Sequence, residues 1–420
     1  MTQTAVSDIL RSASLDLAPY EDLYRHFHAH PELSLQEEST SQTIAAKLSE
    51  LNAFDIHTNI GGFGLAGVLR NGPGKTVLLR ADMDALPVKE ITGLPYASTV
   101  TMRDADGVEK PVMHACGHDM HITCLLAAAE KLVHLRASWS GTLIVLFQPN
   151  EERGAGAQAM VDDGLYDKIP VPDYAFGQHV MRLRAGTVGS RFGTIMAAAD
   201  SMKITVFGRG GHGSLPHHTI DPVLLAAHIV VRLQGIVSRE VDPSDLGVLT
   251  VGSLQAGQTE NIIADRAEIG IDFRSVKLET RDKIIASVKR IVEAECMASG
   301  SPKKPIFTPT RRFPPTVNED ALAARLKTEF AEYFGEAFDG DTPRTNVSED
   351  FSTLATCRDI PCSFWFLGGI DGKLWDEAKV KGTTEEIAGN HSALFAPVIQ
   401  PTMGVGVDAL CVAALSYLKK

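Results

Sequence analysis

Hydrophobic and polar positions in the first third of the chain alternate between short apolar runs and helical spacing. Residues 76–80 (TVLLR) and 141–148 (GTLIVLFQ) are compact apolar runs, the second rich in β-branched residues, and both predict strands. Between them, residues 119–135 carry apolar side chains at the three- and four-residue spacing of a helix. Strands that alternate with helices predict an α/β fold, with a mostly parallel sheet flanked by helices.

The pattern changes near residue 195. From Met202 onward, the predicted elements are a strand at 202–207, a helix at 222–238, strands at 247–253 and 267–273, a helix at 279–298 and a short strand at 306–308. This β-α-β-β-α-β order is typical of a ferredoxin-like α+β domain. The Pro-rich, basic segment 301–315 (SPKKPIFTPTRRFPP) is interpreted as a return linker.

After that segment the first pattern returns, with a strand at 362–369 and a terminal apolar helix at 402–418. We therefore expect a larger α/β domain formed by residues 1–193 and 307–420, with the ferredoxin-like domain of residues 194–306 inserted into it. A length of 420 residues agrees with two domains, because a single hydrophobic core rarely serves so long a chain.

Composition narrows the class of protein. Hydrophobic residues make up 44% and charged residues 22%, as in ordinary globular proteins. The net charge of −12 argues against a nucleic-acid partner, since phosphate backbones are bound by clustered Lys and Arg. The amino terminus does not resemble a secretion signal, and no apolar run approaches the roughly 20 residues that span a bilayer. The six scattered cysteines suit a reducing compartment, so we expect a cytoplasmic protein with no membrane partner.

Chemically active side chains concentrate in five segments beside predicted strand ends, where open α/β sheets bind their ligands. These segments are 80–84 (RADMD), 114–119 (HACGHD), 148–152 (QPNEE), 177–179 (GQH) and 389–392 (GNHS). Taken singly, each has an ordinary interpretation, such as a buried cysteine, a solvated pair of glutamates or a structural histidine. Metal-assisted hydrolysis, however, needs one carboxylate that binds metal and another that accepts a proton, which the adjacent Glu151 and Glu152 would supply.

The motifs RADMDALP, HACGHDMH, FQPNEERGAGA, GGHGSLPH, NIIADRAEIGIDFRS, VSEDFS and NHSALFAP, in this order, resemble the M20 metallopeptidase family. The nearest branch contains hippurate hydrolases, indoleacetyl-amino acid hydrolases and related aminoacylases. The resemblance extends from about residue 26 to residue 397, and the ordered set is far more specific than any single motif. One departure concerns Asn150 and Arg153, which flank the glutamate pair where relatives more often carry small or neutral residues.

The resemblance implies a catalytic site for two divalent metal ions, with the ligands Cys116, His118, Glu152, His179 and His391. Cys116 would bridge the two ions, and Glu151 would be the general base and then the general acid. Asp82 and Asp84 would support the ligands from behind, for example by orienting an imidazole. Sulfur and imidazole ligands suit Zn²⁺, Mn²⁺, Co²⁺ or Ni²⁺ better than Mg²⁺ or Ca²⁺.

The inserted domain contains the run 208–213 (GRGGHG), which matches the G-x-G-x-x-G pattern of dinucleotide sites. The pattern requires a helix to begin at that turn, whereas the predicted helix begins only near Asp221, so an oxidoreductase is disfavoured. The resemblance implies instead that His212 reaches an active site, often that of the partner subunit of a homodimer, and polarises the scissile carbonyl. It also implies that Asn261 and Arg274 hold a substrate carboxylate, a task that suits Arg. A loop histidine without a role and a surface arginine remain the alternatives.

The expected activity is therefore hydrolysis of the amide bond of N-acyl amino acids with an aromatic or aliphatic acyl group. A dipeptidase or carboxypeptidase that uses the same site is the first alternative, since only the pocket would differ. A catalytically silent scaffold is the second, but such a relative should have lost a ligand or the base. None of these residues is missing from the sequence.

Overall fold

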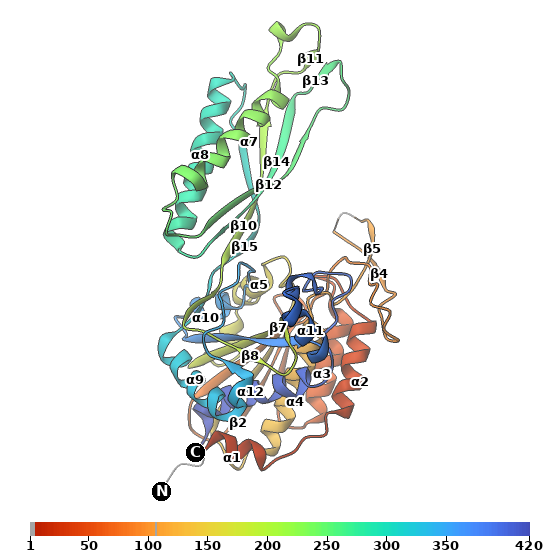
Figure 1. The fold of residues 1–420 in the computed structure, drawn as a ribbon, viewed down its shortest axis with the longest axis vertical. Helices are drawn as coiled ribbons and strands as arrows, with labels where there is room; N and C mark the ends of the chain where they lie inside the picture. Colours follow the sequence, from red (N-terminus) through yellow and green to blue (C-terminus); the bar gives the residue numbers. More distant parts are fainter. Residues whose placement is uncertain (1–4, 106) are drawn as a thin grey trace. The chain divides into compact units, whose positions relative to one another are not determined.

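The computed structural model describes residues 5–105 and 107–420, which divide into two compact units (Figure 1). The larger unit holds the chain up to Ile195 together with Val317–Pro343 and Asp350–Lys420. The smaller unit holds Met196–Thr316 and Arg344–Glu349. The expected end of the inserted domain at residue 306 is therefore too early, and a second short segment also belongs to the smaller unit.

The larger unit is built on an eight-stranded mixed sheet with the order β1-β2-β6-β3-β7-β18-β8-β17. These strands are β1 (Asp55–Ile60), β2 (Gly64–Asn71), β3 (Thr76–Asp82), β6 (Gly141–Gln148), β7 (Tyr174–Arg184), β8 (Val188–Gly189), β17 (Phe338–Asp339) and β18 (Cys362–Ile370). The central strands β6, β3, β7 and β18 run parallel, while β1 and β2 add antiparallel pairing at one edge. The predicted α/β class and the strands at 76–80 and 141–148 are confirmed.

Helices cover the sheet because the central strands are apolar on both faces. Val77 and Leu79 face the core that contains helices α4 (His118–His134) and α12 (Thr402–Leu418), and the intervening Leu78 is equally inaccessible to solvent. Burial of each such side chain contributes about 1.5–3 kcal/mol. The other helices of this unit are α1 (Val6–Arg11), α2 (Ala18–Ala29), α3 (Glu38–Glu50), α5 (Gly156–Asp162), α6 (Leu165–Lys168), α9 (Asp320–Phe334), α10 (Ser352–Thr356) and α11 (Gly372–Lys381).

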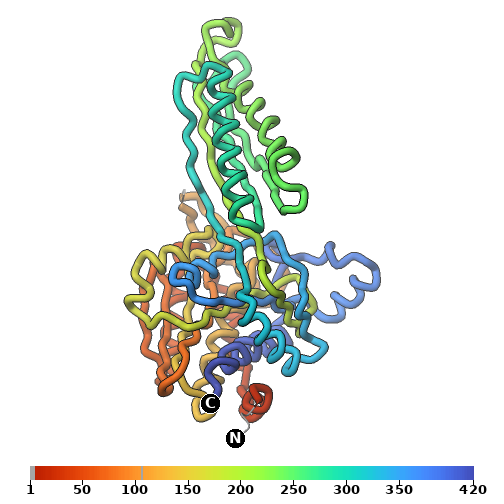
Figure 2. The backbone as a smooth tube through the Cα atoms, turned by 90° about the vertical axis from the view of Figure 1, so that its left-hand side faces the viewer, coloured from red at the N-terminus to blue at the C-terminus, as the bar shows by residue number. Residues whose placement is uncertain are grey.

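The smaller unit has the predicted β-α-β-β-α-β order. Its elements are β10 (Ala198–Phe207), α7 (Pro222–Arg239), β12 (Gly247–Ala256), β14 (Arg266–Ser275), α8 (Leu278–Ala298) and β15 (Ile306–Phe313). The strands form an antiparallel sheet in the order β12-β14-β10-β15, and Figure 2 shows α7 and α8 side by side along it. A short hairpin, β11 (Gly211–His212) with β13 (Ile262–Ile263), completes the unit.

The segment 301–315 is not a linker, as the sequence suggested, but contains the full-length fourth strand β15. Pro309 disfavours a strand in the interior of a sheet because it cannot donate a hydrogen bond. Here β15 is the edge strand, and the register shifts at Ser201 and Met202, beside this proline. The proline therefore lies in an edge strand, next to a break in the regular strand register.

Helix α7 is the one helix in the described part of the chain that is long and apolar enough to cross a membrane. One side of it, including Leu225, Ile229 and Leu233, is buried in the core of the smaller unit. The opposite side exposes Val231, which is 74% accessible. The helix is thus a core helix whose exposed face mixes apolar and polar side chains.

Candidate metal centre

The candidate site lies where the parallel strands of the larger unit end. Asp82 closes β3, the segment after β6 carries Glu151 and Glu152, and β7 carries His179. Helix α4 begins at His118, directly after Gly117, whose φ of 84° belongs to the left-handed region. A β-carbon at Gly117 would lie 2.4 Å from the Val180 side chain, so the tight turn that brings Cys116 and His118 to the strand ends requires glycine.

The structure brings all the predicted ligands together. Cys116 Sγ lies 3.5 Å from His179 Nε2, and Glu152 Oε2 lies 3.3 Å from His391 Nε2. One donor atom each from Cys116, Glu152 and His391 lies within 4.8 Å of the others, and the same is true of His118, Glu151 and Glu152. The arrangement therefore offers sulfur, nitrogen and oxygen donors around a common centre.

Unsatisfied donor atoms show that the residues fit a metal. Both ring nitrogens of His118 and Oε1 of Glu152 are buried and have no hydrogen-bond partner among the described residues. The nearest carboxylate oxygen to a His118 nitrogen belongs to Asp84, at 3.4 Å from Nδ1, and Glu152 Oε1 is 3.8 Å from Nε2. Buried polar atoms normally find a partner, because leaving them unpaired is costly. A divalent cation would satisfy these atoms together.

The negative charges around the predicted ligands also favour binding of a cation. Burial raises the pKa of the Cys116 thiol well above its usual value, and the charges of Glu152 and Glu151 raise it further. Burial alone would lower the pKa of His118, but Asp82, Asp84 and Glu152 outweigh this effect and raise it to about 10. A metal ion that binds here would therefore have to displace protons from these groups.

His179 is held in the neutral form that a metal ligand requires. Burial, together with the neighbouring His121 and His118, lowers the pKa of His179 well below its usual value. Its Nδ1–H donates to the backbone oxygen of Val180 at 2.8 Å. This leaves Nε2, the nitrogen beside Cys116, available as a donor to metal.

The two aspartates after β3 occupy different positions. Asp84 accepts the backbone N–H groups of Glu151 and Glu152, both at 3.1 Å, and the hydroxyl of Ser34 at 2.6 Å. Asp82 is completely buried and accepts from His121 Nδ1 at 2.6 Å. Both aspartates stand next to the ligand cluster, and their supporting role stays a prediction.

Four residues at the site were not singled out from the sequence: Glu37, Arg80, His121 and Asn390. Arg80 is buried and donates to Asp82 Oδ2 at 2.6 Å, and Asn390 donates to the backbone oxygens of Cys116 and Val180. His121 follows His118 by three residues on one helix, so the helical spacing could have drawn attention to it.

Glu37 supports the turn before the glutamate pair. Its Oε1 accepts the backbone N–H of Asn150 at 2.8 Å, and Asn150 itself has a φ of 55°. Burial and the nearby charge of Asp84 raise the pKa of Glu37 to about 8. The environment therefore favours the protonated form of this carboxyl group.

The predicted residues of the inserted domain lie at two ends of the smaller unit. His212 and Asn261 are exposed neighbours at the β11–β13 hairpin, where Gly213 N–H donates to the backbone oxygen of Asn261. Arg274 lies near the other end of β14, roughly 26 Å along the strand from Arg266. Arg274 donates to Asp272 Oδ1 at 2.9 Å. Within one chain, Asn261 and Arg274 cannot hold one carboxylate together, and their roles stay predictions.

Known proteins resemble this chain in sequence and in architecture. Residues 78–383 match Peptidase family M20/M25/M40. The chain is 38% identical over 361 residues to a hippurate hydrolase of Campylobacter jejuni, which covers 84% of this chain and 89% of that protein. It is 34% identical over 422 residues to thermostable carboxypeptidase 2 of Saccharolobus solfataricus. This match covers 98% of this chain and 100% of that protein.

Among solved structures, the YxeP protein of Bacillus subtilis, a dinuclear metal-binding peptidase from the M20 family, superposes with a TM-score of 0.73. The match has 26% sequence identity and covers 94% of this chain and 97% of that chain. The family resemblance, the enzyme class and the fold predicted from the sequence are thereby confirmed. The chain belongs to peptidase family M20/M25/M40 and is a hydrolase that acts on amide bonds.

Proposed function

We propose that this enzyme hydrolyses the amide bond of N-acyl amino acids that carry an aromatic or aliphatic acyl group. The observation that supports this most strongly is the convergence of Cys116, Glu152 and His391 on one centre beside Glu151. Cys116, His118, Glu152, His179 and His391 would hold two divalent ions, of Zn, Mn, Co or Ni. When bound, such ions would lower the pKa of a water toward roughly 7 and polarise the scissile carbonyl.

Glu151 is suited to move the proton in this reaction. Its side chain is largely buried, and its backbone is fixed by the hydrogen bond to Asp84. We assign it the acceptance of the proton from the attacking water and its later donation to the leaving amine. Glu152, one residue further, would bind metal, so the adjacent carboxylates would have separate tasks.

A peptidase activity is the second candidate, and a specific observation favours it. The carboxypeptidase relative aligns over 98% of this chain and 100% of its own length. Acyl-amino acids and dipeptides share a free carboxylate beside the scissile amide, and Arg274 is the residue we propose to bind it.

We further propose a cytoplasmic homodimer formed through the inserted domain. Strand β12 is an edge strand, and its exposed apolar side chains include Val248 and Leu254, at 38% and 43%. Val231 on α7 is also accessible. Exposed apolar side chains beside an unpaired edge favour association with a second copy, which would bring its His212 to the scissile carbonyl. Sedimentation equilibrium should give twice the chain mass, whereas a monomer at micromolar concentration would contradict the dimer.

The experiment that tests the activity is a hydrolysis assay on N-acetyl, N-benzoyl and indoleacetyl amino acids, with dipeptides in parallel. Each substrate is incubated with chelated enzyme and again after addition of Zn²⁺, Mn²⁺, Co²⁺ or Ni²⁺. Metal-restored cleavage of acyl-amino acids in preference to dipeptides is the expected result. Preference for dipeptides would support the peptidase, and folded protein without any cleavage would contradict both.

A further inference from the structure

The backbone N–H and C=O of Val180 in β7 form hydrogen bonds with side chains, although Leu367 of β18 lies opposite this residue in the sheet. Strand β3 pairs with β7 only as far as Arg80 opposite Gly177. Beyond that point Val180 is fully buried, and its N–H donates to His121 Nε2 at 2.8 Å. Its carbonyl oxygen accepts from His179 Nδ1 and from Asn390 Nδ2. His121 therefore supplies the acceptor that the departing strand no longer provides.

These contacts determine the tautomer of His121. A backbone N–H can only donate, so Nε2 of His121 carries no proton and uses its lone pair on Val180. The ring proton is on Nδ1 and donates to Asp82 Oδ1 at 2.6 Å. Asp82 Oδ2 accepts from Arg80 Nη1, and Arg80 Nε donates to Gln148 Oε1. A buried chain of hydrogen bonds thus extends from β6 through β3 and α4 to β7.

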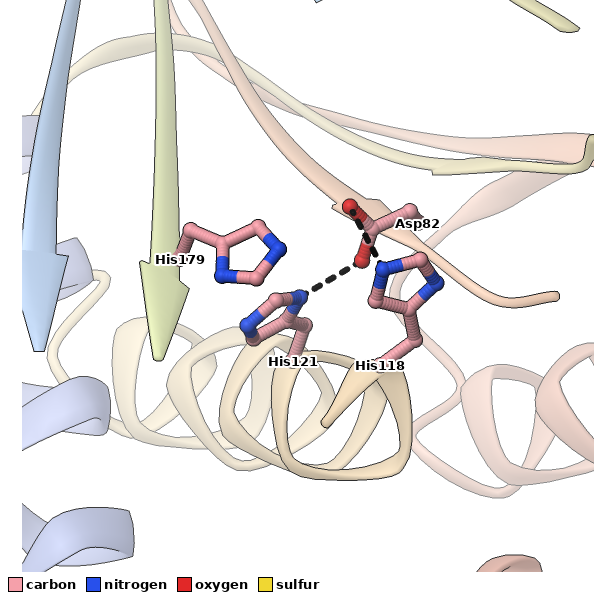
Figure 3. Close-up of side chains that lie close together, drawn as sticks. All are labelled: Asp82, His118, His121 and His179. Atoms are coloured by element: carbon pink, nitrogen blue, oxygen red, sulfur yellow. Dashed lines mark hydrogen bonds and ion pairs between the residues drawn. The ribbon is translucent and has the colours of Figure 1, made fainter. Parts of the chain in front are cut away.

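By position alone, His121 could be taken for a metal ligand. Figure 3 shows it in a group with Asp82, His118 and His179, and the four offer donor atoms within 4.8 Å of one another. Its ring centroid is 4.5 Å from that of His179. Both of its nitrogens are nevertheless engaged, whereas the nitrogens of His118 have no hydrogen-bond partner among the described residues.

We propose that His121 is a positioning residue of the metal centre and does not bind metal itself. By fixing the backbone of Val180 through its N–H, His121 keeps the carbonyl oxygen of the same residue in place to accept from His179 Nδ1. This keeps His179 Nε2 beside Cys116 Sγ. Partners that orient a ligand in this way strongly affect metal affinity. The inference rests on the proposed metal centre, but the hydrogen bonds it invokes join only groups of the protein itself.

Two substitutions separate the two hydrogen bonds of His121. In His121→Gln, the side-chain amide can place its oxygen near the position of Nε2 and accept from Val180. In His121→Asn, the shorter amide can replace Nδ1 as the donor to Asp82 but cannot reach Val180. The two variants have the same polarity and nearly the same size, so each is the control for the other.

The first measurement is amide hydrogen exchange of Val180 in chelated protein. We expect exchange about tenfold faster in His121→Asn than in the wild type, and near wild-type exchange in His121→Gln. Equal protection of Val180 in the wild type and His121→Asn would overturn the proposal. Because no metal and no substrate are present, this result does not depend on the proposed activity.

The second measurement is metal binding, by titration of Zn²⁺ against a competing chelator. We expect His121→Asn to bind about 10- to 100-fold more weakly than the wild type, while His121→Gln stays within about threefold. Both variants should still bind two ions per chain at saturation. Loss of one ion in both would identify His121 as a ligand and overturn the proposal.

The wild type provides a test that does not require a variant to fold. In protein labelled with ¹⁵N-histidine, the ring shifts of His121 should report a protonated Nδ1 before and after addition of Zn²⁺. The shifts of His118 and His179 should change on addition of the metal. A metal-induced shift of the His121 Nε2 resonance, as large as that of His179, would contradict the positioning role.

Discussion

The backbone N–H of Glu151 donates to Oδ1 of Asp84 at 3.1 Å, a bond that ties the proposed proton carrier to the end of β3. The other oxygen of Asp84 accepts from Glu152 N–H and from Ser34. One buried carboxylate therefore fixes the turn on which both glutamates stand.

Replacing Asp84 with alanine should disturb this turn without removing a metal ligand. We expect kcat to fall about 10- to 100-fold, because the glutamates lose the group that orients them. Steady-state kinetics at saturating metal measures the effect. Asp320→Asn, an exposed position in the larger unit, is the control and should retain wild-type kcat. Unchanged kcat in Asp84→Ala would contradict the role given to Asp84.

The two adjacent glutamates should respond differently to substitution. Glu151→Gln should keep its two metal ions and lose a factor of about 100 to 10,000 in turnover, because the amide cannot accept the proton. Glu152→Gln should instead weaken metal binding, since it removes a ligand. Metal analysis together with kcat distinguishes these outcomes. Normal turnover in Glu151→Gln would rule out the proposed mechanism.

Metal binding should release protons near pH 7. The pKa of Cys116 is raised well above its usual value and that of His118 is raised to about 10, so both groups are protonated in the chelated protein. Because ligands must lose these protons, metal affinity should increase as pH rises from 6 to 8. Calorimetric titration of Zn²⁺ in buffers of different ionisation enthalpy counts the protons. Affinity that does not vary with pH would show that the ligands are already deprotonated.

Stability should fall as pH rises through the alkaline range, because of a buried ion cluster beside α4. His28 lies between Asp119, at 2.6 Å, and Glu90, at 3.1 Å. Burial alone would lower the pKa of His28, but the hydrogen bonds and charges of Asp119 and Glu90 raise it to about 10. In the unfolded chain the pKa of a histidine is about 6.5.

Between these values the folded protein binds more protons at this group than the unfolded protein. The contribution of His28 to the free energy of unfolding is therefore complete below pH 6.5. It is lost as pH rises through 10, at up to about 1.4 kcal/mol per pH unit. Urea unfolding of the wild type and of His28→Gln measures it. At pH 6.5 the variant should be less stable than the wild type. Between pH 6.5 and pH 10 its free energy of unfolding should fall by less than that of the wild type. Parallel curves for the two proteins would contradict the assignment.

The sequence alone determined those parts of the fold that depend on local periodicity. The strand at 141–148 and the terminal helix at 402–418 have the predicted bounds, because a continuous apolar run or a helical apolar pattern needs no knowledge of its neighbours. The resemblance of the sequence motifs also implied a set of metal ligands, which stays a prediction; the structure places donor atoms of Cys116 and of His118 each within 4.8 Å of a Glu152 oxygen.

Tertiary structure decided the features that depend on which segments become neighbours. Segment 301–315 was predicted as a linker, yet Pro309 lies in a strand, and only the sheet order shows that this strand is at an edge, where proline is tolerated. The separation of Asn261 and Arg274 follows from the length of β14.

The role of His121 illustrates the same limit. In the sequence, His121 is one more histidine near a metal motif. Only the structure shows that the pairing of β3 with β7 ends before Val180, so that the N–H of Val180 needs another acceptor. Periodicity records which side chains are buried, whereas hydrogen-bond partners between distant strands and helices are set by packing in three dimensions.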